Sequence, residues 1–206
     1  MLAWCDRQFG MGLGPWRFWR NVVLLSLAGL LPALWIFVAR TPGFASHLAQ
    51  ADGALAPFLR QVLTTGLPVV VAVNAVGMAL FARLRAGVLG PRAALGLDVI
   101  GRVGLFSALQ GALFAGSAVA FGAFGGDPAQ GLAALGPTLV RGAGFGNLAG
   151  VYFHATVLSA LPLHLALVTI ATGSPPRWES LVAALGMFGL QALALAGVGV
   201  ALTRMG

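Results

Sequence analysis

Five long apolar blocks dominate the sequence and limit what the chain can fold into. They cover about residues 21–39, 62–83, 98–121, 150–172 and 180–202. The Gly- and Ala-rich stretch before the fourth block predicts a short helix in the membrane interface, and Ser174, Pro175 and Pro176 predict a tight turn between the last two blocks. Each block is close to the roughly 20 residues that a helix needs to cross the hydrocarbon core of a bilayer. Charged residues make up only 8% of the chain, whereas a soluble domain carries about 25%. The sequence therefore predicts an all-α integral membrane protein, a bundle of five transmembrane helices.

Residues 1–20 precede the first block and combine aromatic with basic side chains. Indole rings and guanidinium groups both favour the head-group region of a membrane. We therefore expect an interfacial N-terminal segment, followed by a single transmembrane bundle over residues 21–206. The first apolar block is too long for the core of a cleaved signal peptide and is interpreted as an uncleaved anchor. The predicted interface anchors are Trp4, Trp16, Arg17, Trp19 and Arg20.

The basic residues indicate how the chain is oriented. All twelve are arginines, they occur one or two at a time near the ends of the blocks, and the net charge is +7. This pattern is typical of contacts with lipid head groups and not of nucleic-acid binding. The absence of lysine favours a GC-rich bacterial source. The side with the excess is expected to be cytoplasmic, which predicts a bacterial inner-membrane protein with a cytoplasmic N-terminus and a periplasmic C-terminus. That side holds Arg7, Arg17, Arg20, Arg83, Arg85, Arg92, Arg102 and Arg177, and the other holds Arg40, Arg60, Arg141 and Arg204.

Small residues recur along three of the blocks. Without a hydrophobic driving force in lipid, such faces allow helix backbones to approach closely. They predict a tightly packed bundle or an interface with other membrane subunits or a second copy of the chain. The faces consist of Ala75 and Ala79, then Ala108, Ala112, Gly116 and Ala120, then Gly189, Ala192, Ala196 and Gly199.

Five polar side chains stand inside the apolar blocks and form the candidate site. They are Asn74, Gln110, His154, His164 and Gln191. Polar groups at this depth need hydrogen-bond partners and are functional candidates. Two interpretations remain open. The five side chains either form hydrogen bonds that hold helices together or line a polar path for a solute.

The two histidines limit the choice of cofactor. His154 and His164 are ten residues apart on one helix, which separates them by about 15 Å and turns them about 80° apart. They cannot ligate one haem from both sides. No cofactor is predicted, although a haem or chlorin held by His154 or His164, with Met78 or Met187 opposite, stays open.

The sequence contains few residues of the kinds that catalysis and proton transport use. The single Cys5 excludes an internal disulfide and a multi-cysteine metal site. Only five acidic residues occur, and Asp98 and Glu179 are expected at helix ends. A proton-coupled pump usually has a carboxylate at membrane depth, so this expectation weakens active transport. We expect no enzyme.

One run invites a comparison with a known family. The stretch from Arg141 to His154, RGAGFGNLAGVYFH, with Glu179 and Gln191 in the next helix, resembles the Arg–Asn–Ala–Gly–His segment of the proton-channel subunit of rotary ATP synthases. It departs from that pattern because Arg141 is far from Asn147 and lies among glycines outside the apolar block. Membership of that family is therefore not inferred.

Three functional hypotheses follow. The leading one is a non-catalytic subunit or assembly factor of a larger membrane complex, because almost nothing is left outside the membrane for chemistry. The second is a small-solute transporter or channel lined by the five polar residues. The third is a haem- or pigment-carrying membrane subunit.

Overall fold

A computed structural model describes residues 2–10, 12–50, 53–173 and 178–205. Within these ranges, five helices are long and apolar enough to cross a membrane: Pro15–Arg40, Leu55–Arg85, Pro91–Phe121, Leu148–Thr172 and Trp178–Met205. They confirm the five predicted spans and the all-α membrane bundle. All five begin before the predicted blocks, because the helices continue past the apolar residues into flanking segments. The predicted turn at Ser174–Pro176 lies outside the described residues.

Short helices connect the spans. The described elements are α1 (Leu2–Phe9), α2 (Pro15–Arg40), α3 (Phe44–Gln50), α4 (Leu55–Gln61), the π-helical turn η1 (Val62–Gly66), α5 (Leu67–Arg85), α6 (Pro91–Phe121), the 3-10 turn η2 (Ala123–Gly126), α7 (Pro128–Ala133), α8 (Leu135–Ala143), α9 (Leu148–Thr172) and α10 (Trp178–Met205). The α4, η1 and α5 elements are continuous and together form the second span.

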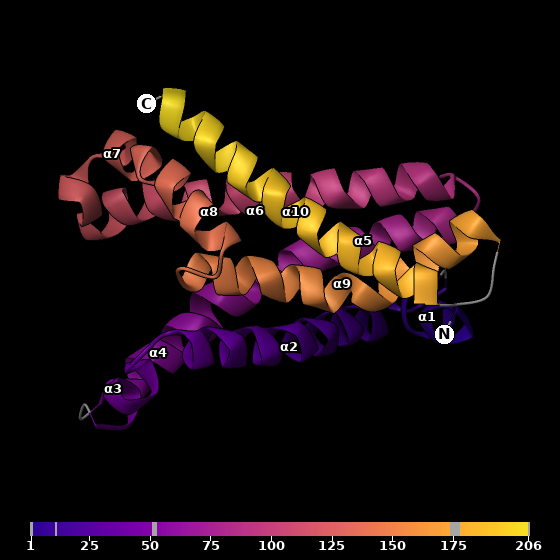
Figure 1. Cartoon of the computed structure of the whole chain (residues 1–206), viewed down its shortest axis with the longest axis horizontal. Helices are drawn as coiled ribbons and strands as arrows, with labels where there is room; N and C mark the ends of the chain where they lie inside the picture. Colours follow the sequence, from indigo (N-terminus) through magenta and orange to yellow (C-terminus); the bar gives the residue numbers. More distant parts are fainter. Residues whose placement is uncertain (1, 11, 51–52, 174–177, 206) are drawn as a thin grey trace.

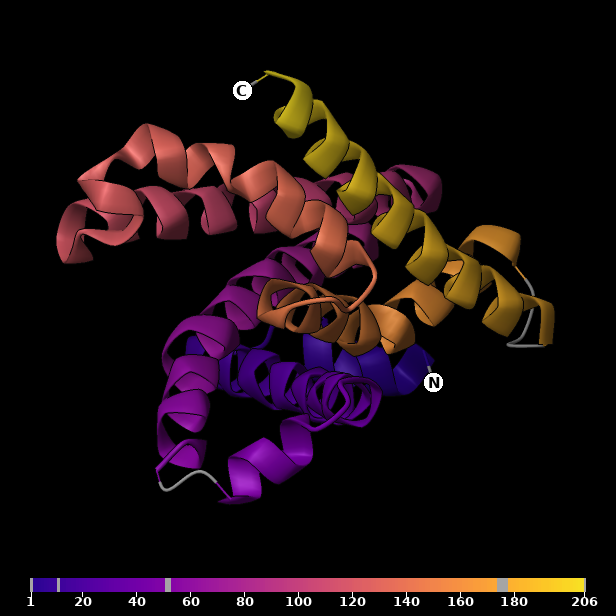
Figure 2. The same cartoon turned by 60° about the vertical axis from the view of Figure 1, so that its left-hand side comes forward.

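Helix α9 is the centre of the bundle. It packs against α2, α5, α6, α8 and α10, and its position between them can be followed in Figures 1 and 2. In its most apolar stretch 61% of the residues are buried inside the protein, compared with 17% for α10. The α10 helix crosses α9 and α6 obliquely on the outside (Figure 1). Four polar residues of α9, which are His154, Thr156, Ser159 and His164, are each at most 2% exposed and are therefore shielded from lipid by protein.

The short elements gather at the two ends of the long axis. Helix α1 lies at one end, while α3, α4, α7, α8 and the end of α10 lie at the other (Figure 1). The chain thus starts and finishes on opposite sides, as five crossings require. The predicted short helix between the third and fourth spans is present as α7 and α8, and it leaves the number of crossings unchanged. Which end is cytoplasmic stays a prediction.

Helix α1 is tied to the bundle by polar contacts. Asp6 accepts two hydrogen bonds from Arg85 at the end of α5, at 2.6 and 2.8 Å. Asn21 of α2 donates to the Gln8 carbonyl at 2.8 Å. Burial raises the pKa of the Cys5 thiol to about 11, so Cys5 is a neutral packing residue at physiological pH and not a nucleophile.

The predicted N-terminal segment is divided between two helices. Trp4 belongs to α1, whereas Trp16, Arg17, Trp19 and Arg20 belong to the first turns of α2. The indole rings of Trp16 and Trp19 are exposed, as a contact with lipid or head groups requires. Their location at the membrane interface stays a prediction.

Candidate functional site

One face of α6 carries an unusual series of side chains. Asp98, Arg102, Phe106 and Gln110 recur every four residues, and each is at most 4% exposed. Side chains at this spacing lie on one face of a helix. This stripe is directed at the central helix α9, so the charged pair faces protein and not lipid.

The position of Asp98 corrects a prediction. The sequence placed it at the start of the third span, but α6 begins two turns earlier, at Pro91. Proline is well suited to the first turn of a helix, where its missing N–H costs nothing. Asp98 is therefore about 10 Å inside the helix. Arg102 lies deeper and is 1% exposed, so it is not one of the arginines that meet the head groups.

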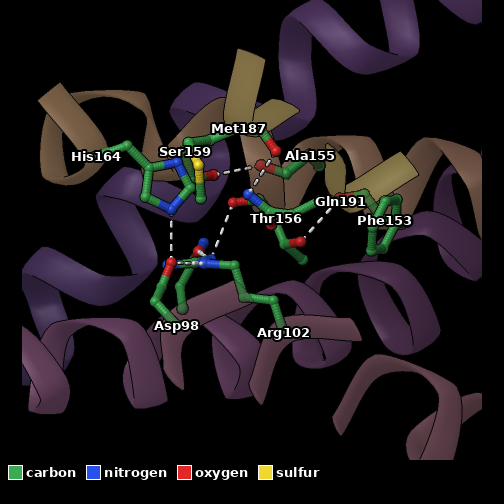
Figure 3. A network of polar contacts seen from close by, with 10 residues as sticks. Asp98, Arg102, Phe153, Ala155, Thr156, Ser159, His164, Met187 and Gln191 are labelled. Atoms are coloured by element: carbon green, nitrogen blue, oxygen red, sulfur yellow. Dashed lines mark hydrogen bonds and ion pairs between the residues drawn. The ribbon is translucent and has the colours of Figure 1, made fainter. Parts of the chain in front are cut away.

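Asp98, Arg102 and His164 form a buried charged cluster (Figure 3). The Asp98 Oδ2 atom accepts hydrogen bonds from Arg102 Nε at 2.8 Å and from His164 Nε2 at 2.6 Å. Arg102 Nη1 donates to Asn74 Oδ1 at 2.7 Å and to the Thr156 carbonyl at 3.0 Å. The cluster thus links α5, α6 and α9 through charge-assisted hydrogen bonds, which are stronger than those between neutral groups.

Two further features hold the cluster in place. Asn74 Nδ2 donates to Ser26 Oγ at 2.9 Å, and Ser26 donates to the Val22 carbonyl at 2.8 Å, which extends the contacts to α2. Gly77, one turn after Asn74 on α5, lies directly against the charged pair. A Cβ atom there would overlap the Arg102 guanidinium and the Asp98 carboxylate. The absence of a side chain at Gly77 therefore makes room for the cluster.

Two nitrogens of the cluster have no partner among the described residues. They are Arg102 Nη2 and His164 Nδ1, and both are buried. Arginine is always charged and an ionised carboxylate can only accept, so the His164 proton that faces Asp98 is on Nε2. In a neutral imidazole, Nδ1 then keeps a free lone pair.

A cleft of about 630 Å³ opens in the other half of the bundle. This volume is typical of small-molecule sites. Its walls come from α4, η1, α6, α8 and α9 and the residue preceding α9. It is lined by Gln61, Thr65, Gln110, Ala112, Leu113, Phe114, Gly116, Ser117, Phe121, Thr138, Arg141, Asn147, Leu148, Ala149 and Tyr152.

Two buried polar atoms of the cleft lack a hydrogen-bond partner. Gln110 is 4% exposed and Tyr152 is 3% exposed, and neither Gln110 Nε2 nor the Tyr152 hydroxyl is paired among the described residues. The Tyr152 ring lies against Gly66, the last residue of η1, where a Cβ would overlap the ring. Pi-helical turns occur often at functional sites, and here the turn also brings Thr65 to the cleft.

An aromatic pair separates the charged cluster from the cleft. The Phe106 and Phe153 rings meet edge to face, with centroids 5.2 Å apart, and both are fully buried. Phe106 lies midway between Arg102 and Gln110 on α6, which are about 12 Å apart along the helix axis.

The structure divides the five predicted site residues among separate places. Asn74 and His164 belong to the charged cluster, and Gln110 lines the cleft. The other two, His154 and Gln191, belong to neither. A single polar path lined by all five residues stays a prediction, and the two sites described here also use Asp98, Arg102 and Tyr152.

His154 and Gln191 have local contacts. His154 Nδ1 pairs with the Gly150 carbonyl at 2.8 Å, and its ring stacks on Phe145 with centroids 3.6 Å apart. Gln191 Nε2 donates to the Met187 carbonyl at 3.2 Å on its own helix. Packing and a hydrogen bond within its own helix thus accompany the burial of His154.

No group of three or more His, Cys, Asp or Glu side chains that could hold a metal ion occurs among the residues that the structure describes. Ligation of a haem or chlorin by His154 or His164 stays a prediction, and an absorption spectrum of the purified protein tests it.

Asn147, in the run that resembles the ATP synthase subunit, acts as a helix cap. Its Oδ1 accepts from the Gly150 N–H at 2.9 Å, and its Nδ2 donates to the Thr138 carbonyl at 2.9 Å. Arg141 lies in α8 and is exposed at the cleft.

Comparisons with protein-family models, with curated proteins and with solved structures give no match.

Proposed function

We propose that the protein carries a small solute across the membrane and that this transport is coupled to a proton held by the charged cluster. One observation supports this most strongly. A carboxylate, a guanidinium and an imidazole meet at Asp98 Oδ2, inside the span. Ionisable groups at this depth are costly, and they mark ion pathways and proton relays in membrane proteins.

The chemistry of the cluster fits uptake and release of one proton. The charges of Asp98 and Arg102 cancel, so the cluster is neutral while His164 is neutral. A proton on His164 Nδ1 makes the cluster positive, and the new N–H has no acceptor among the described residues. Protonation therefore favours a rearrangement in which His164 or Arg102 finds another partner.

Helix α6 offers the route by which this rearrangement reaches the cleft. Arg102, Phe106 and Gln110 lie on one face of the same helix, and Phe106 closes the space between the two sites. A rotation of α6 that follows a change of partners at Arg102 would move Phe106 and Gln110 together and change the contact of Phe106 with Phe153 of α9. This is the coupling that alternating access requires.

The depth of Asp98 changes how the hypotheses rank. The sequence argument against active transport was the expected lack of a carboxylate inside a span. Asp98 lies inside the third span and is 3% exposed. This position weakens that objection, and we therefore place transport ahead of the non-catalytic subunit.

The test is solute-dependent proton movement in vesicles. The full chain is reconstituted into liposomes that contain a trapped pH-sensitive dye, and anions, cations, amino acids and sugars are added outside one at a time. We expect at least one solute to change the internal pH in the wild type. The His164→Gln variant keeps an N–H for Asp98 but cannot take up the proton, so it should lose the response.

The matched control is His154→Gln, which removes a histidine of the same helix outside the cluster and should leave the response intact. A wild-type protein that moves protons with no solute class, or a His164→Gln variant that responds normally, would overturn the proposal.

A second candidate, a subunit of a larger membrane complex, is favoured by the outer face of α6. The predicted stripe of Ala108, Ala112, Gly116 and Ala120 is exposed, and Ala112 and Gly116 of this stripe also line the cleft. Close helix contacts in membranes use faces of this kind. Blue-native electrophoresis of gently solubilised membranes tests this candidate, and a free monomer would count against it.

A further inference from the structure

We propose that the cleft binds an amphipathic anion, with its acidic group at Gln110, Tyr152 and Arg141 and a short apolar body beside it. The inference rests on the proposed transport function, for which it names the class of solute. It stands on three features of the cleft, which are unpaired buried polar atoms, the sign of the charge and the apolar wall.

The unpaired atoms indicate that the cleft is built for a polar ligand. Gln110 Nε2 and the Tyr152 hydroxyl are buried and have no partner in the described structure. Buried polar groups in folded proteins are almost always paired, and leaving them unpaired costs free energy. Both residues line the cleft, so the Gln110 amide and the Tyr152 hydroxyl are the donors that it offers to a ligand oxygen.

The charge of the lining selects an anion. Arg141 lines the cleft, and no acidic residue does. An adjoining hollow shares Gln61 and Thr65 with the cleft and adds Arg60. Neither arginine has an acidic partner within the described residues. An amide N–H, a phenol O–H and a guanidinium are all donors, which is the set that an oxyanion accepts from.

The remaining wall is apolar and sets the shape of the ligand. The apolar lining comes from Leu113, Phe114 and Phe121 of α6 and from Leu148 and Ala149 of α9. A small inorganic anion would leave this surface without contacts. A volume of about 630 Å³ accommodates an acidic group together with a short hydrocarbon body. Such an anion could be a free solute or the acidic head group of a membrane lipid.

The experiment is a binding titration with sodium hexanesulfonate, which stays ionised and so carries no protons passively through lipid. The full chain in a neutral detergent is titrated by calorimetry. We expect binding of hexanesulfonate and none of hexanol or hexyltrimethylammonium. Gln110→Leu, Tyr152→Phe and Arg141→Gln should each weaken it by about 10- to 100-fold, the usual effect of losing a hydrogen bond to a charged group.

Two controls separate binding from folding. Arg40→Gln removes an exposed arginine that does not line the cleft and should bind normally. Arg141→Lys restores the positive charge and should recover part of the affinity. Equal binding of hexanol or of the cation, or no binding of hexanesulfonate by a folded wild type, would overturn the inference.

A second arm distinguishes the two sources of the anion. The chain is placed in nanodiscs of phosphatidylcholine or of phosphatidylglycerol, and the titration is repeated. Undiminished binding in phosphatidylglycerol assigns the cleft to a free solute, whereas competition that Arg141→Gln abolishes assigns it to an anionic lipid. Both results support the anion site.

The outcomes for this inference and for the transport proposal can be told apart. Hexanesulfonate binding without any solute-dependent proton movement would leave the anion site standing and reject coupled transport. Proton movement driven by a sugar or a cation, with no anion bound, would leave transport standing and reject the anion site.

Discussion

The charged cluster and the cleft use successive turns of α6 but differ in how their main polar groups are paired. In the cluster, an ionised carboxylate and a guanidinium are paired with each other and with His164 and Asn74. In the cleft, the neutral groups of Gln110 and Tyr152 remain unpaired. Buried charge must be balanced by the protein itself, whereas a neutral polar group can be left for a ligand. This contrast distinguishes the charged cluster, for which we propose a bound proton, from the cleft, for which we propose a bound ligand.

The largest expected effect breaks the cluster. Asp98→Ala leaves the Arg102 guanidinium buried without a counter-charge, which typically costs about 3–5 kcal/mol. We expect a markedly lower midpoint of thermal unfolding in detergent, followed by circular dichroism. The double variant Asp98→Leu with Arg102→Leu removes both charges and should recover much of the stability while transport stays lost. An Asp98→Ala protein that unfolds like the wild type would contradict the pairing.

Gly77→Ala tests the packing around the cluster without changing any charge. The added Cβ overlaps the Arg102 and Asp98 side chains, so we expect destabilisation by about 1–3 kcal/mol, as for other overpacked sites. Gly104→Ala on α6 is the control, because nothing lies within 4 Å of that Cβ. The control should be neutral or slightly stabilising. Equal unfolding midpoints for the two variants would show that Gly77 is not needed for room.

Tyr152→Phe sharpens the contrast because its expected effect on stability is opposite to that of Asp98→Ala and Gly77→Ala. It removes a buried hydroxyl that has no partner, so the stability of the unliganded protein should be unchanged or rise by about 1 kcal/mol. The same variant should bind hexanesulfonate more weakly. Thermal unfolding with and without the anion measures both effects. A clear loss of stability without ligand would mean that the hydroxyl has a partner within the protein.

The smallest effect is expected outside both sites. Asp6→Asn weakens the ion pair with Arg85. The Asp6 side chain is 34% exposed and the Arg85 side chain is 41% exposed. Solvent screens such pairs, and their contribution is usually below about 1 kcal/mol. The unfolding midpoint should therefore change little, and binding and proton movement should not change. A large loss of stability would indicate that the docking of α1 governs the bundle.

Local sequence patterns predicted the spans well because hydropathy and helix length are properties of a continuous stretch. The same reasoning marked Asn74, Gln110 and His164 by residue type and depth. It misplaced Asp98, because the apolar run was read as the limit of the helix, while Pro91 starts α6 two turns earlier. The four-residue spacing from Asp98 to Gln110 was a usable signal for the stripe.

Other features depend on how distant segments meet. Tyr152 became a site residue only because Gly66 of η1 lies against its ring. His154 and Gln191 resembled His164 and Gln110 in the sequence, yet they face different surroundings. No run of neighbouring residues contains that information, since it arises from the contacts between α5, α6, α9 and α10.

The η1 turn has a mechanical consequence for the entrance of the cleft. A π-helical turn holds an extra residue compared with an α-helical one. If Val62–Gly66 tightened to the α-helical form, the segment before it would swing by about 100°, the angle of one residue. Helix α4, with Arg60 and Gln61, would rotate relative to α5, while α5 kept its contacts with the rest of the protein. The part of the cleft lined by Gln61 would thus change shape without any movement of the other helices that line the cleft.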